Sequence, residues 1–105
     1  FVDMDLLWGM PSSYLHKEVF CLVKIIGVND NPNYFSITVG DPKNSFDFKN
    51  PLELDVRIGK SDLSMVEKII KSKGKTAVLS GIVRKSNELF EGHYFEITRF
   101  IAHDN

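Results

Sequence analysis

The chain has 105 residues, of which 43% are hydrophobic and 26% charged, so it has the size of one ordinary domain with a single core. Its formal net charge is −1 and its isoelectric point is about 6.3, whereas domains that hold nucleic acid by charge alone usually have isoelectric points above roughly 9. No apolar run approaches the roughly 18 residues of a membrane-spanning helix, which argues against an integral membrane helix.

The N-terminal residues 1–17 form an irregular lead-in before the first regular element. The sequence begins at Phe1 rather than at a methionine, so we expect it to be a fragment of a longer protein. Its segment 4–10 is apolar but short, and Pro-Ser-Ser at 11–13 follows it as a break. Two interpretations are open: the lead-in closes one end of the domain, or it docks onto a partner. We favour the first.

Residues 18–28 are almost continuously apolar and rich in Val and Ile, which predicts a strand rather than a helix. Residues 29–33 (Asn-Asp-Asn-Pro-Asn) predict a turn. A second strand follows over 34–39. Its alternation predicts two sets of side chains, one buried (Phe35, Ile37, Val39) and one facing water (Tyr34, Ser36, Thr38).

The single cysteine, Cys21, lies inside the first predicted strand, so no internal disulfide can form. A buried structural thiol is the usual role of a cysteine in such an apolar stretch. A reactive thiol is the less favoured alternative, because no neighbouring residue in the sequence would lower its pKa. A reducing, intracellular compartment fits this cysteine usage.

The second half of the chain predicts a third strand, one helix and a final pair of strands. After a turn over 40–45, the third strand is marked by alternating apolar residues at Leu52, Leu54, Val56 and Ile58. The helix runs from an N-cap at Ser61 to Lys73, with Gly74 as its stop. Its apolar stripe is Leu63, Val66, Ile69 and Ile70. Residues 76–84 and 93–102 predict the last two strands, joined by a hairpin loop over 86–92.

The order strand, strand, strand, helix, strand, strand, with the helix between the third and fourth strands, resembles the OB-fold over residues 18–102. Two glycines, Gly27 and Gly81, fall where the strands of such a barrel must coil. The resemblance implies an all-β fold with one main helix: a single closed five-stranded barrel. Among OB domains the chain looks most like the small modules of replication-protein-A-like and telomere-capping complexes.

That resemblance implies a module of a DNA-maintenance assembly in the nucleus, where it would bind single-stranded DNA, a partner subunit, or both. RNA in place of DNA stays open. The alternative is a purely protein–protein interaction or dimerisation domain that binds no nucleic acid. Each implication rests on fold resemblance and is therefore an association, since function resides in the site rather than in the fold.

Residues arranged for catalysis are missing from the sequence. The histidines His16, His93 and His103 lack cysteine or carboxylate neighbours at metal-ligand spacing. The run 59–61 (Gly-Lys-Ser) matches only the end of a phosphate-binding loop, because Leu54 occupies the position of the required first glycine. We therefore expect no enzymatic activity, no metal and no cofactor.

OB domains usually bind ligands across their second and third strands and the flanking loops. The candidate nucleic-acid-binding residues there are Tyr34, Lys43, Phe46, Phe48, Lys49, Arg57, Arg84, Lys85 and Tyr94. They combine basic groups for phosphates with aromatic rings for base stacking. The carboxylates Glu53 and Asp55 oppose this, because they would repel phosphates at the centre of the groove. Packing of Phe46 and Phe48 beneath their own loop is an equally supported interpretation.

Large apolar side chains outside the predicted core favour a protein partner instead. The candidate partner-binding residues are Leu6, Leu7, Trp8, Leu89 and Phe90. The last two fall at the tip of the final hairpin loop, where their own domain would not bury them, and a contiguous apolar patch marks an interaction site. The partner would be another subunit of the same complex or a second copy. We interpret the lysines on and after the helix as a solvated face.

Overall fold

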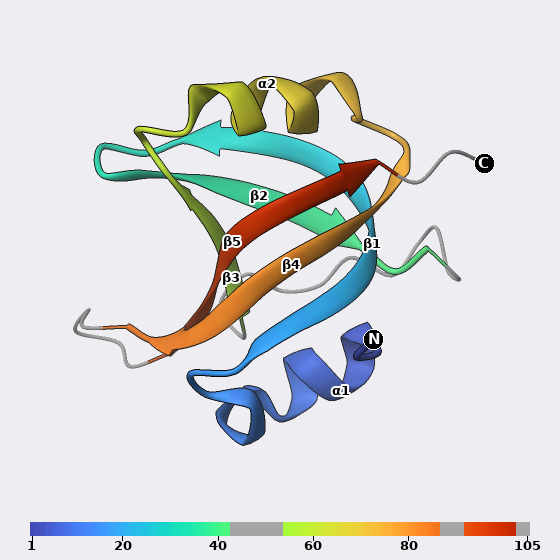
Figure 1. Cartoon of the computed structure of the whole chain (residues 1–105), viewed down its shortest axis with the longest axis vertical. Coiled ribbons are helices and arrows are strands. Elements are labelled where there is room, and N and C mark those ends of the chain that lie inside the picture. The colour runs from blue at the N-terminus through green and yellow to red at the C-terminus, as the bar shows by residue number, and fades with distance from the viewer. Residues whose placement is uncertain (43–53, 87–91, 103–105) are drawn as a thin grey trace.

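The computed structural model describes residues 1–42, 54–86 and 92–102. Within them, five strands form a closed barrel that lies between two helices (Figure 1). The strands are β1 (Glu18–Asp30), β2 (Tyr34–Gly40), β3 (Leu54–Gly59), β4 (Thr76–Lys85) and β5 (His93–Ala102). The helices are α1 (Met4–Gly9), the short 3-10 helix η1 (Pro11–Tyr14) and α2 (Leu63–Lys71). The predicted five-stranded barrel, with its main helix between the third and fourth strands, is confirmed.

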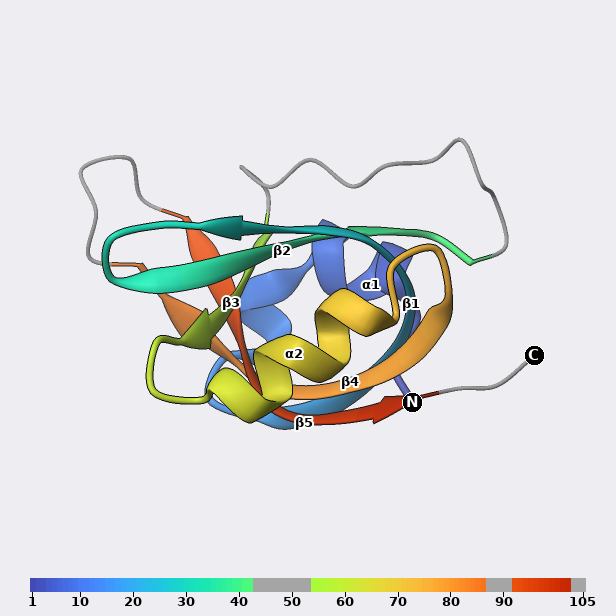
Figure 2. The ribbon, with the colours of Figure 1, turned by 90° about the horizontal axis from the view of Figure 1, so that it is seen from above.

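The barrel closes in the order β1-β2-β3-β5-β4. The long strand β1 is shared: residues 18–24 pair with β4 and residues 24–30 pair with β2. The pairing of β3 with β5 is parallel and completes the ring, while the other pairs of described strands are antiparallel. Figure 2 shows α2 lying across one opening of this ring.

The core is made by alternate residues of all five strands. On β2, Ile37 and Val39 are buried and Phe35 packs against the core, so the predicted buried face of this strand is confirmed. The thiol of Cys21 is buried, as expected for a structural cysteine. Burial raises the pKa of this thiol to about 12, with smaller contributions from the carboxylates of Asp3 and Asp41.

Helix α2 differs from its prediction at its start and along its apolar stripe. The N-cap is Asp62, whose carboxylate accepts a hydrogen bond from the backbone N–H of Met65 at 3.3 Å, and not Ser61. Only Val66 and Ile69 are buried, while two further stripe members stay exposed: Leu63 (61%) and Ile70 (53%). A helix this short, lying across the barrel opening, turns one narrow face inward. Gly74 ends the segment with a φ of 83°, which favours glycine.

Helix α1 covers the opposite end of the barrel from α2 (Figure 1). Its residues Met4, Leu7 and Trp8 belong to the core, so the lead-in closes one end of the domain as the favoured interpretation predicted. The prediction of Leu7 and Trp8 as exposed partner-binding residues is wrong, because they are 0% and 5% exposed. The third residue of that group on this helix, Leu6, is 48% exposed. In the described residues, no helix has the length and apolar character to cross a membrane.

Two bulges bend the barrel, one beside Gly27 in β1 and one beside Gly81 in β4. The two glycines differ in the space around them. A Cβ at Gly81 would lie 2.6 Å from the carbonyl oxygen of Glu96 and 2.7 Å from the ring of Phe95, whereas a Cβ at Gly27 would meet nothing within 4 Å. Only Gly81 therefore marks a close approach that a side chain would prevent.

We predict that Gly81→Ala destabilises the domain by about 2–3 kcal/mol, because the added methyl group forces backbone and ring apart. Gly27→Ala is the matched control and should change the free energy of unfolding by less than about 1 kcal/mol. Urea denaturation of both variants measures the difference. Equal losses at the two positions would contradict the packing described for Gly81.

Trp8 gives a second test, since its buried indole Nε1 has no hydrogen-bond partner in the described part of the chain. We predict that Trp8→Ala costs about 3–5 kcal/mol of unfolding free energy. Trp8→Phe should cost much less, because it keeps an aromatic ring in the core and removes an unpartnered donor. Thermal and urea unfolding check both. A Trp8→Ala variant as stable as the parent would restore Trp8 as a candidate surface anchor.

Candidate nucleic-acid interface

The outer face of β2, β3 and β5 brings together three of the predicted binding residues: Tyr34, Arg57 and Tyr94. Each comes from a different strand. In the register, Tyr34 lies opposite Gly59 and Tyr94 lies opposite Asp55. Arg57 is two residues from both of these positions on β3, so it lies diagonal to both rings, a separation that long side chains bridge.

The guanidinium of Arg57 packs against both tyrosine rings. Its Cζ atom is 4.1 Å from the ring centroid of Tyr34 and 4.6 Å from that of Tyr94. Each such cation–π contact contributes roughly 0.5–2 kcal/mol, more where water is excluded. We call these three residues the Tyr–Arg–Tyr stack. It ties three strands together on one face and fixes the orientation of both rings.

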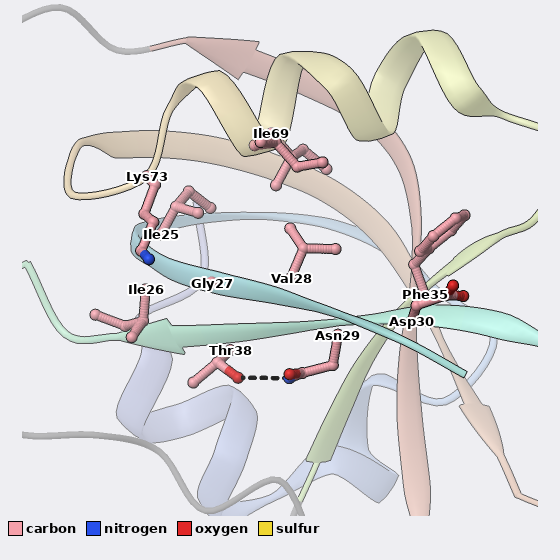
Figure 3. A pocket seen from close by; sticks show the side chains of 11 residues that line it. Ile25, Ile26, Gly27, Val28, Asn29, Asp30, Phe35, Thr38, Ile69 and Lys73 are labelled. Carbon is pink, nitrogen blue, oxygen red and sulfur yellow. Dashed lines mark hydrogen bonds between the residues drawn. The ribbon is translucent and has the colours of Figure 1, made fainter.

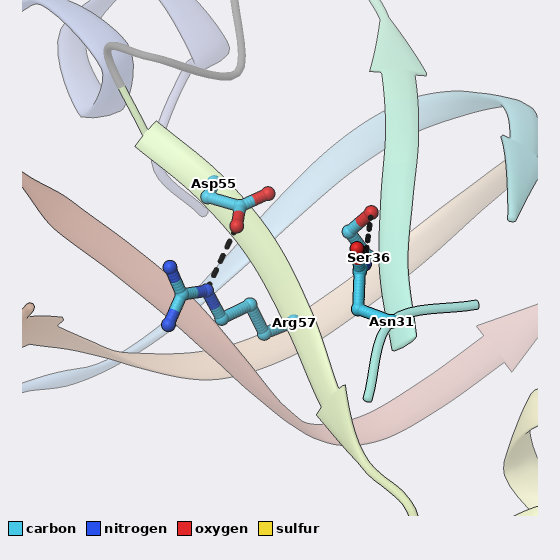
Figure 4. A network of polar contacts seen from close by, with 4 residues as sticks. All are labelled: Asn31, Ser36, Asp55 and Arg57. Atoms are coloured by element: carbon cyan, nitrogen blue, oxygen red, sulfur yellow. Dashed lines mark hydrogen bonds and ion pairs between the residues drawn. The ribbon is translucent and has the colours of Figure 1, made fainter. Parts of the chain in front are cut away.

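Arg57 also donates a hydrogen bond from Nε to Oδ2 of Asp55 at 2.8 Å (Figure 4). The two side chains are only 15% and 19% exposed. The sequence-based expectation that Asp55 repels phosphates is therefore incomplete, because its carboxylate is paired with a guanidinium. Glu53, the other carboxylate in that expectation, lies outside the described residues.

A second ion pair lies beside the stack. Arg84 of β4 faces Tyr94 across the β4–β5 pair, and its Nε donates to Oε1 of Glu96 at 3.2 Å. Both side chains are about two-fifths exposed, so water screens this pair and its contribution to stability is small. The described face thus pairs each arginine with a carboxylate. Lys85 is exposed at the end of β4, opposite His93.

The rim of this face carries a hydrogen bond between uncharged side chains. Asn31, in the turn after β1, donates from Nδ2 to Oγ of Ser36 at 3.2 Å (Figure 4). Asn31 and Glu96 are site residues that the sequence reasoning missed. Alternation along the fifth strand could have identified Glu96, which shares a face with Tyr94. The sequence around Asn31 indicated only a turn.

The remaining predicted site residues lie outside the described residues. They are Lys43, Phe46, Phe48 and Lys49 between β2 and β3, and Leu89 and Phe90 between β4 and β5. Within the described ranges, no group of three or more His, Cys, Asp or Glu residues is placed to hold a metal ion.

Neither a protein-family model nor a curated protein sequence matches this chain. Solved structures do resemble it. The OBody AM2EP06, solved bound to hen egg-white lysozyme, superposes with a TM-score of 0.63 at 13% sequence identity. The match covers 89% of this chain and 85% of the OBody.

Larger proteins contain a similar domain. A protein assigned as an aspartyl-tRNA synthetase from Leishmania major Friedlin matches 96% of this chain with a TM-score of 0.67 at 7% identity. The aspartyl-tRNA synthetase of Entamoeba histolytica matches 89% with a TM-score of 0.53 at 10% identity. This chain spans 20% of the length of each synthetase. At such low sequence identity, structural similarity is evidence of the fold alone. Together with the closed barrel and the position of α2, it shows that the chain has the OB-fold.

Proposed function

We propose that this chain is a non-catalytic OB module that binds single-stranded nucleic acid across β2, β3 and β5. The observation that carries the proposal is the Tyr–Arg–Tyr stack on that face. OB-folds commonly bind oligonucleotides on the strands that correspond to β2 and β3. Stacking of bases on aromatic rings would be the main attractive interaction in the complex.

The stack suits this role because it presents two aromatic rings whose orientation is already set. Each base stacked on an aromatic side chain contributes about 1–3 kcal/mol. Tyrosine has few rotatable bonds, and Arg57 holds one face of each ring, so little conformational entropy is lost when a base binds the other face. Both tyrosines are half-buried rather than fully buried.

Charge plays a minor part in this proposal. The described face carries Arg57 and Arg84, and each is paired with a carboxylate. Few phosphates would be neutralised, so few counterions would be released and the salt dependence would be shallow. The net charge of −1 agrees with such weak electrostatic attraction.

The cellular setting is a finer part of the proposal. We propose that the ligand is single-stranded DNA and that the module belongs to a nuclear DNA-maintenance assembly of the telomere or replication-protein-A type, where it also contacts a partner subunit. Its support is the order of strands and helix, which resembles that of such modules, and the suitability of the fold for single strands. The test below includes RNA as the alternative ligand.

A protein ligand on the same face is the second candidate. Its specific support is the balance of charge there, since tyrosine and arginine without excess positive charge are typical of the centre of protein interfaces. The OBody bound to hen egg-white lysozyme is an example of this fold holding a protein.

We predict that fluorescently labelled single-stranded DNA binds with modest affinity and that Tyr94→Ala weakens binding about tenfold or more, the loss of one stacked base. Tyr34→Ala should act similarly. Tyr34→Phe and Tyr94→Phe are the matched controls and should retain most of the affinity, because the aromatic face remains. Fluorescence anisotropy, repeated with an RNA of the same sequence, measures the effect.

The same titration across salt concentrations tests whether stacking rather than charge dominates the binding. Stacking-dominated binding predicts that log Kd changes with log salt by a slope of about 2 or less, equivalent to two or three phosphates. A steep slope, or equal binding by parent and both alanine variants, would contradict the proposed site. If neither DNA nor RNA binds, the protein-ligand candidate takes precedence.

A further inference from the structure

An apolar groove of about 500 Å³ lies away from the Tyr–Arg–Tyr stack, between α2 and the hairpin of β1 and β2. Val28 of β1 and Ile69 of α2 project toward one another across it, with Phe35 at one end and Lys73 at the other (Figure 3). Gly27 lies in its floor and leaves open space, since a Cβ there would meet nothing within 4 Å. The barrel and its helix therefore do not fill this space themselves.

The helix side of the groove carries apolar surface that the domain leaves uncovered. Ile70 lines the groove and is 53% exposed, and Leu63 is 61% exposed. The two residues are seven positions apart, which places them on the same side of a helix two turns apart. Ile70 adds exposed aliphatic surface to an open groove, which is typical of a binding surface.

The charged residues that line the groove are Lys73 and Asp30, and Lys60 lies beside Asp30. The adjoining segment 60–75 has a net charge of +3 in a chain whose net charge is −1, although its Lys68 lines a different pocket, beside β5. Within the described residues, Lys60 pairs with Asp30 and lies over the ring of Phe35. No ion pair within those residues engages Lys73, at the other end of the groove.

We propose that this groove docks an acidic amphipathic segment of a partner protein. Its large aliphatic side chains would enter between α2 and β1, and its carboxylates would meet Lys73. Charge complementarity of this kind increases specificity for the partner and speeds association. Lys73 and Ile70 would be the central contacts.

Other occupants fit the observations less well. A second copy docking through α2 would bring two groups of lysines together, and such like charges oppose association. Nucleic acid would meet the lysines, but the groove walls are aliphatic, and its aromatic residue, Phe35, already lies beneath Lys60. Bases need an accessible ring face for stacking. Apolar protein side chains with nearby carboxylates match both the walls and the rim.

A displayed library of short random peptides, selected on the whole domain, tests this proposal. We expect the recovered peptides to be rich in glutamate or aspartate and in leucine, isoleucine or phenylalanine. In NMR titrations with a recovered peptide, the backbone amides of β1, β2 and α2 around the groove should shift. Ile70→Asp and Lys73→Glu should each weaken that peptide's affinity at least about tenfold, corresponding to about 1.4 kcal/mol.

Two matched controls at the opposite end of the barrel keep the test specific: Met10→Asp for the apolar change and Lys17→Glu for the charge reversal. Both positions are exposed, so affinity should stay within about twofold of the parent, a difference of about 0.4 kcal/mol. Because Ile70 and Lys73 are also exposed, both groove variants should fold, and thermal unfolding confirms this.

Several results would overturn the proposal. They are the recovery of no acidic peptides, peptide binding that survives both groove variants, and amide shifts confined to the face of β2, β3 and β5. Self-association in light scattering that Ile70→Asp abolishes would assign the groove to a second copy. Shifts of groove amides with single-stranded DNA would assign it to nucleic acid. Loss of oligonucleotide binding in Tyr94→Ala leaves this site intact, so the two proposals fail separately.

Discussion

The close approach of the Phe95 ring to the backbone of Gly81 is the contact on which the arrangement of this domain depends. Because Gly81 has no side chain, β5 can lie tightly against β4 while Phe95 fills the core. The register between β4 and β5 shifts beside this point, and residues 93–96 of β5 pair in parallel with β3 on the other edge, which closes the barrel. A side chain at residue 81 would oppose this closure by direct overlap.

Closure in turn creates the proposed binding face. Only when β5 lies beside β3 does Tyr94 reach the guanidinium of Arg57, which already contacts Tyr34 across the neighbouring strand. The stack therefore depends on packing elsewhere in the barrel, because that packing holds the three strands side by side. Its ion pair with Asp55 holds the guanidinium and cancels a charge that would otherwise repel a phosphate. Stability and proposed function share this one cluster.

The helices at the two ends of the barrel differ in which of their apolar side chains are buried. At one end, α1 buries Leu7 and Trp8, and a pocket of about 540 Å³ lies beside the start of this helix. At the other, α2 buries Val66 and Ile69 but leaves Ile70 beside an open groove. The proposed stacking surface therefore lies on the wall of the barrel, whereas the apolar groove lies beside α2. Residues 60–75, which include α2, carry a net positive charge.

The sequence by itself determined the strands, the helix and the buried face of β2, because alternation and helix stops are local signals carried by neighbours such as Ile37, Val39 and Gly74. It also named Tyr34, Arg57 and Tyr94 as candidates. Only the tertiary structure decided that these three meet, since their contact requires the register of three strands from distant parts of the chain. Likewise, periodicity marks Trp8 and Ile70 alike as apolar, and the shape of each barrel end decides that one is covered and the other exposed.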